Sequence, residues 1–177
     1  MVKKIILFFA YTLFFVVALM YFTPKSSVYF LLEEQLKKYD VVISSEEINE
    51  RAFTLSVTDA DVSFKSISSA KIAKSDLKIF AFYNSLNFED ITLSSTAKAF
   101  VPLRVERVEL VYSILNPLNV TLYGVGEFGE VNAEFNILQR SLHLRLKPSQ
   151  AMNNNYKNTL KNLTKTENGE FTYDKAF

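Results

Sequence analysis

The chain has 177 residues, a formal net charge of +1 and no cysteine. This charge balance excludes the strongly basic surface that supplies most nucleic-acid affinity, so we expect no DNA or RNA partner. The lack of cysteine excludes a disulfide framework, a thiolate metal site and thiol catalysis. Roughly 150 residues follow an apolar N-terminal segment, which is enough for one domain with its own core.

The N-terminal segment is an almost unbroken apolar run from Ile5 to Phe22, preceded by Lys3 and Lys4. A helix over this run measures roughly 27 Å, close to the thickness of a bilayer's hydrocarbon core. The alternative is a cleaved signal peptide, but the run is too long for one and no small-x-small cleavage site follows it. We therefore predict an uncleaved membrane anchor within residues 1–25, with a cytoplasmic N-terminus.

Residues 26–40 have a helical period. Apolar side chains recur at three- and four-residue spacing, and glutamates and lysines fill the other face, with the apolar set being Val28, Leu31, Leu32, Leu36 and Tyr39. The pattern predicts a juxtamembrane amphipathic helix. Packing of this helix on the following sheet is the interpretation we favour, and a position on the membrane surface is the alternative.

Residues 41–177 change to an alternating period, as in Phe53, Leu55 and Val57, with a turn expected at residues 58–61. Regularly spaced short strands predict a curved antiparallel meander, either an open sandwich or a half-barrel, and Pro102 and Pro117 are expected at edges or turns. A second amphipathic helix is expected over residues 149–163, followed by a last strand. The predicted fold is mainly β, with a transmembrane helix and two short helices flanking the sheet.

Residues 77–83 are predicted to form one strand that is apolar on both faces. Ile79 and Ala81 would face one way, and Phe80 and Phe82 the other. A helix or a second layer covering the extra face is the interpretation we favour. The alternative is that Phe80 and Phe82 line an apolar groove or docking face for an acyl chain or a partner.

Three glycines, Gly124, Gly126 and Gly129, match the pattern G-x-G-x-x-G. A dinucleotide loop with this pattern requires a helix to begin there, so that its amides face the pyrophosphate. The residues that follow alternate as a strand instead. We therefore predict that the three glycines mark a bend of the backbone and bind no nucleotide.

No group of residues has the spacing of a catalytic or metal-binding constellation. The single histidine, His143, lies on the polar side of a predicted strand with no acidic cluster near it in sequence. We expect a protein that is not an enzyme and that holds no cofactor or metal.

The order of these parts resembles the inner-membrane protein N of type II secretion and its AsmA-like relatives. The resemblance rests on the anchor, the short helix and four segments, which are residues 53–57 (FTLSV), 122–129 (LYGVGEFG), 142–149 (LHLRLKPS) and 168–171 (NGEF). It covers most of the chain. It implies a bitopic protein with a curved periplasmic β-domain, and larger relatives carry lipid along an apolar groove.

Two functions follow as hypotheses. The first, which the sequence favours, is a structural or accessory subunit of an envelope-spanning machine such as a secretion or motility apparatus, held in the inner membrane and docking to protein partners. The second is a lipid-binding or lipid-transfer module. Oligomerisation is compatible with both.

Overall fold

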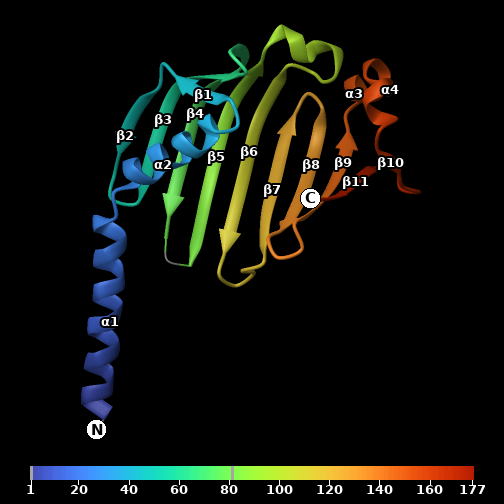
Figure 1. Cartoon of the computed structure of the whole chain (residues 1–177). Helices are drawn as coiled ribbons and strands as arrows, with labels where there is room; N and C mark the ends of the chain where they lie inside the picture. Colours follow the sequence, from blue (N-terminus) through green and yellow to red (C-terminus); the bar gives the residue numbers. More distant parts are fainter. Residues whose placement is uncertain (1, 81) are drawn as a thin grey trace.

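The structure is a computed structural model that describes residues 2–80 and 82–177 (Figure 1). The helices are α1 (Val2–Phe22), α2 (Lys25–Lys37), the 3-10 helix η1 (Ser95–Ala99), α3 (Gln150–Asn155) and α4 (Lys157–Leu160). The strands are β1 (Val41–Ser44), β2 (Glu47–Glu50), β3 (Thr54–Phe64), β4 (Ile67–Ile79), β5 (Tyr83–Leu93), β6 (Arg104–Ser113), β7 (Asn119–Gly126), β8 (Gly129–Asn136), β9 (Ser141–Pro148), β10 (Thr164–Lys165) and β11 (Phe171–Ala176). The prediction of a mainly β chain with an apolar N-terminal helix and short helices is confirmed.

Helix α1 projects away from the rest of the molecule (Figure 1). None of its residues is buried, and it is long and apolar enough to cross a membrane. The hydroxyl of Thr12, in the middle of α1, donates to the carbonyl oxygen of Phe8 at 2.9 Å. A hydroxyl bonded within its own helix is tolerated in an apolar environment, because it exposes no unpaired donor.

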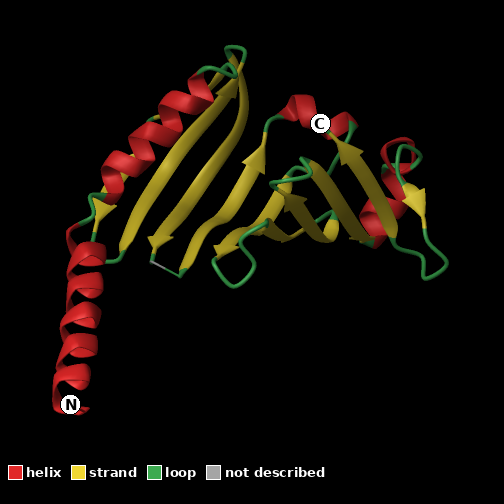
Figure 2. Ribbon diagram, turned by 60° about the horizontal axis from the view of Figure 1, so that its bottom comes forward, coloured by secondary structure: helices red, strands yellow, loops and turns green. Residues whose placement is uncertain are grey.

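The strands form one open antiparallel sheet in the order β1-β3-β4-β5-β6-β7-β8-β9-β11-β10. The short strands β1 and β2 both pair with β3, one after the other along it. Successive strands are neighbours from β3 to β9, as the predicted meander requires. The sheet twists and curves along its length without closing (Figure 2).

The turn expected at residues 58–61 is wrong, because β3 continues through it. Asp59 has a left-handed backbone with φ 55°, and it shifts the alternation by one residue, so that Ala60 is buried on the same side as Leu55 and Val57. Asp90 does the same in β5, with φ 51°. Aspartate tolerates this conformation better than most residues. The residues that predicted a turn therefore form a local kink within a long strand.

The two ends of the sheet carry separate cores. Under α2, the core consists of Leu55, Val57 and Ala60, against which Tyr29 of the helix packs. Burial, with the carboxylates of Glu46 and Glu33 nearby, raises the pKa of the Tyr29 phenol above its usual range, so the side chain stays neutral. Packing of this helix on the sheet agrees with the interpretation that the sequence favours.

At the other end, Leu146 and Phe171 of the sheet are buried against Met152 and Leu160. One helix over residues 149–163 was expected, but the structure has two short helices, because the backbone leaves the helical region at Tyr156 (φ −122°, ψ 35°). The break lets both helices turn their apolar residues toward the same core.

The glycine motif forms the β7–β8 hairpin. Gly126 pairs with Gly129, which leaves Glu127 and Phe128 as the turn, and strand β8 follows as predicted. Gly129 has φ +113°, and an added Cβ would lie 2.2 Å from the carbonyl oxygen of Lys147. Gly124 and Gly126 lie within β7, where an added Cβ would come within 2.8 Å of Val131 or of the β6 backbone. At Gly124 and Gly126 a side chain would therefore clash with the neighbouring strand, and at Gly129 the positive φ favours glycine.

We expect Gly129→Ala to lower the free energy of unfolding by more than Gly169→Ala. Both glycines have a left-handed φ, which costs an alanine about 1 kcal/mol or more, but Gly169 has no heavy atom within 4 Å of an added Cβ. Only the Gly129 variant adds a clash with backbone. Thermal unfolding of the two full-length variants in nanodiscs measures the difference, and equal midpoints would show that the clash is relieved at no cost.

Candidate functional site

The register aligns apolar side chains in rows that cross the whole sheet on one face. The first row runs, strand by strand from β3 to β11, through Leu55, Leu77, Leu86, Leu110, Leu122, Ala133, Leu144 and Tyr173. The second runs through Val57, Ser75, Phe88, Val108, Gly124, Val131, Leu146 and Phe171. Directly paired residues point to the same side of a sheet, so apart from Ser75 and the hydroxyl of Tyr173 these rows make one face apolar from β3 to β11.

The helices cover only the two ends of this apolar face. Helix α2 lies over the first strands, and α3 and α4 lie at the far end, with β6 and β7 open between them (Figure 1). The residues left between the two cores are half-buried and form what we call the central strip, which is Leu86, Phe88, Val108, Leu110, Leu122 and Ala133. Contiguous apolar surface of this kind on a folded protein marks an interaction site.

A cleft between α2 and the sheet joins the first core to the central strip. Leu32 and Leu36 line it from the helix, and Leu86 and Phe88 line it from β5. These two helix leucines are 44% and 37% exposed, so α2 turns part of its apolar side toward the open strip and not only toward the core beneath it. The cleft is therefore a side wall of the strip.

The opposite face of the sheet is polar. Lys74 pairs with Asp76 at 2.8 Å and with Glu89 at 3.6 Å. Burial would raise the pKa of Asp76, but the hydrogen bonds from Lys74 and Ser56 outweigh it and hold that pKa below its usual range. His143 lies on this face as predicted and pairs with Asp174. This polar face is suited to contact with solvent. The apolar face is therefore the candidate functional site.

The strand predicted over residues 77–83 is wrong. Strand β4 ends at Ile79 and β5 begins at Tyr83, so Phe80 and Phe82 lie between the two strands, and the predicted orientation of Ala81 falls outside the described residues. The ring of Phe80 stacks on Phe53 at 5.7 Å between centroids, and Phe82 is 58% exposed. Neither phenylalanine belongs to the central strip, and their role as a docking face stays a prediction.

The central strip was not predicted from the sequence. The signal was present in β5, where Ser85, Leu86, Asn87 and Phe88 alternate, and again in β6 and β7. Alternation alone identifies an apolar side for each strand. Only the pairing of the strands shows that these sides line up and that no helix of the described residues lies over the middle.

Among the described residues, no group of three or more His, Cys, Asp or Glu is placed to hold a metal ion. Comparison of the chain with protein-family models, with curated proteins and with solved structures finds no match. The central strip therefore has to be interpreted from its own geometry.

We expect Leu55→Asp and Leu110→Asp to differ sharply in stability, although the two leucines share one row. Leu55 is 0% exposed beneath α2, so a carboxylate there would lose its hydration at a cost of several kcal/mol, against a total stability of only about 5 to 15 kcal/mol. Leu110 is half-buried on the uncovered part of the face, where a carboxylate can reach water.

Thermal unfolding of both full-length variants in nanodiscs, with near-UV circular dichroism as a check on packing, tests this contrast. We expect Leu110→Asp to keep a cooperative transition near that of the wild type and Leu55→Asp to lose it. Loss of the transition in both variants would mean that protein covers the middle of the face.

Proposed function

We propose that this chain is a membrane-anchored module that binds lipid acyl chains on the central strip. One observation carries the proposal, which is the uncovered apolar strip between two helix-covered ends of a single sheet face. An acyl chain matches it chemically, because burying it removes apolar surface from water on both sides and requires no polar partner. Binding then needs neither a catalytic residue nor a cofactor, in line with a protein that is not an enzyme.

The proposed location is the inner membrane of a bacterial cell, crossed once by α1. Lys3 and Lys4 favour a cytoplasmic N-terminus, which directs the β-domain to the periplasm. The resemblance to the type II secretion protein N and its AsmA-like relatives points to the same arrangement.

For this topology, we expect protease added to spheroplasts to degrade the β-domain while a cytoplasmic marker protein stays intact. Loss of the N-terminal segment from the mature protein, or a β-domain that survives until the membrane is permeabilised, would contradict it.

A second candidate function is that of a structural subunit in an envelope complex. The observation that favours it is the edge of β11. Strand β10 pairs only with Phe171 and Thr172 of β11, which leaves residues 173–176 without a strand partner on that side within the described part of the chain. An open edge of this kind can accept a strand from a partner protein.

Photo-crosslinking from two adjacent positions of β7 tests the lipid proposal. Leu122 lies on the central strip, and Tyr123, which is 40% exposed, faces the opposite side of the sheet. With a benzophenone amino acid at either position in intact membranes, we expect lipid adducts at position 122 and few at position 123.

Mass spectrometry of the crosslinked chain identifies what is captured. Equal lipid capture at both positions would mean nonspecific contact with the membrane and would contradict the proposal. A protein captured at position 122 in place of lipid would favour the structural subunit.

A further inference from the structure

Three connections at one end of the sheet form a continuous border. They are Phe80 and Phe82 between β4 and β5, residues 114–118 between β6 and β7, and residues 137–140 between β8 and β9. Backbone hydrogen bonds join them, since the amide of Ile114 donates to the carbonyl of Phe82 at 3.2 Å and the amide of Ile137 donates to that of Leu118 at 2.8 Å. Side chains from separate hairpins are thereby held side by side.

These connections expose large apolar side chains. Leu115 is 93% exposed, Leu138 75% and Phe82 58%. With three further residues that are about half exposed, they form what we call the apolar rim, which is Phe82, Ile114, Leu115, Leu118, Ile137 and Leu138. Single exposed apolar residues are common on proteins, but a set held together along one border indicates contact with an apolar partner.

The connections that carry the apolar rim differ in charge from those at the opposite end of the sheet. Arg140 is the one charged residue in the three connections that carry the apolar rim. At the opposite end, each connection between consecutive strands contains a charged residue, which is Lys65 between β3 and β4, Lys98 between β5 and β6, and Glu127 between β7 and β8. The connections of the apolar rim therefore carry fewer charged residues, although Arg51, between β2 and β3, lies at the same end of the sheet.

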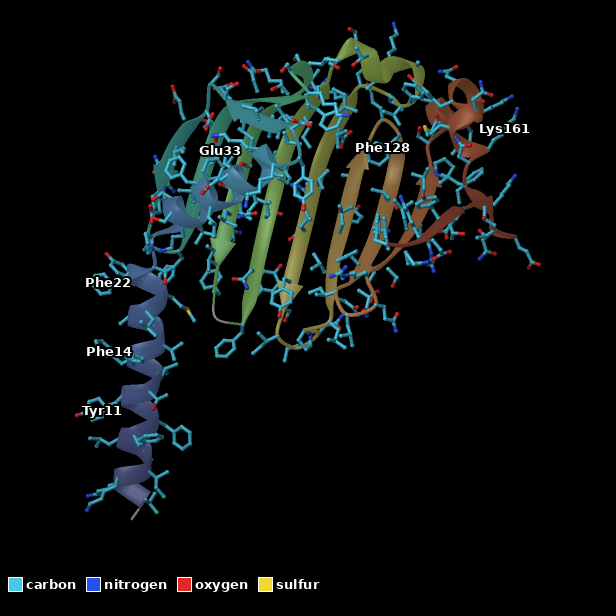
Figure 3. The ribbon with its side chains drawn as sticks, viewed as in Figure 1. Tyr11, Phe14, Phe22, Glu33, Phe128 and Lys161 are labelled. Carbon is cyan, nitrogen blue, oxygen red and sulfur yellow. The ribbon has the colours of Figure 1, made fainter. Side chains whose placement is uncertain are left out.

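The connections that carry the apolar rim lie at the end of the strands from which α1 projects (Figures 1 and 3). Phe80, next to the rim, lines a surface hollow together with Val16, Leu19 and Met20 of α1. The β4–β5 hairpin therefore reaches alongside the last two turns of the membrane helix. Val16 precedes the end of α1 at Phe22 by six residues, or about 9 Å along the helix axis at about 1.5 Å per residue.

Hydrogen bonds fix the joint between α1 and the domain. The Lys25 side chain is 1% exposed, and its Nζ donates to the carbonyl oxygens of Met20 (3.1 Å), Tyr21 (3.2 Å) and Thr23 (2.7 Å) at the end of α1. Glu50 of β2 accepts from the backbone amides of Lys25 (2.9 Å) and Ser26 (3.2 Å). A cation at the carboxyl end of one helix and a carboxylate at the amino end of the next hold the sheet in place beside α1.

We propose that the apolar rim inserts into the surface of the same bilayer that α1 crosses. When α1 spans the membrane, the fixed joint brings the rim to the level of the lipid headgroups and the first acyl carbons. There, exposed leucine and phenylalanine side chains are stabilised by removal from water, and Arg140 can pair with a lipid phosphate. This inference depends on α1 lying in the membrane, but it is independent of lipid binding on the central strip.

Single cysteines test the inference directly, because the chain has none of its own. Leu115→Cys and Leu138→Cys place an environment-sensitive NBD dye on the rim. Phe100→Cys, at a residue 64% exposed at the opposite end of the sheet, is the matched control, and Phe14→Cys in α1 is the membrane reference. The full chain is reconstituted in vesicles of phosphatidylcholine and phosphatidylglycerol.

We expect the dyes at positions 115 and 138 to emit at shorter wavelength than the dye at 100, to be quenched by nitroxide placed near the headgroup end of the acyl chain, and to resist quenching by iodide. A dye at 14 that is quenched by lipid nitroxide, together with rim dyes that behave like the dye at 100, would overturn the inference and leave the proposed function standing. A dye at 14 that is open to iodide would overturn both.

Discussion

The antiparallel register determines which side chains share a face of the sheet, and therefore where the apolar surface of this protein lies. Side chains alternate between the two faces of a strand, so a slip of one residue between neighbouring strands would carry the apolar rows to the polar side. The pairing of Leu55 with Leu77, Leu77 with Leu86 and Leu86 with Leu110 shows that the register keeps those rows together. The left-handed residues Asp59 and Asp90 correct the phase of the long strands where alternation alone would turn Ala60 and Ile91 outward.

Exposure of a whole apolar face to water is unfavourable. In this protein, helices cover the two ends of that face but not its middle. Helix α2 buries the beginning, and α3 and α4 bury the end (Figure 2). The central strip lies between them on paired strands, and the register shift between β6 and β7, at Val105 and Arg107, falls outside the strip. The sheet is thus held at both ends by its own cores, and the middle is free to take an occupant without loss of the fold. That division links packing to the proposed lipid-binding function.

The sequence predicts the helices and strands better than it predicts how the strands pair and where the helices pack. The apolar run from Ile5 to Phe22 and the helical period after it require only local spacing, and both helices form there. Residues 77–83 mislead because Phe80 and Phe82 lie between two strands and their apolar side chains serve contacts elsewhere. Phe80 stacks on Phe53 near the end of α1, and Phe82 lies on the apolar rim. The central strip depends on strand pairing and on where helices are absent, and neither property is encoded in any one segment.

If the central strip holds lipid, the protein should carry lipid when it is taken from the membrane. Native mass spectrometry of the full chain, extracted gently from membranes, measures bound lipid per chain in the wild type, in a Leu110→Asp, Leu122→Asp double variant and in a Tyr123→Asp control on the polar face. We expect the wild type and the control to carry lipid and the double variant, although folded, to have lost it. Equal lipid content in all three proteins would contradict the claim.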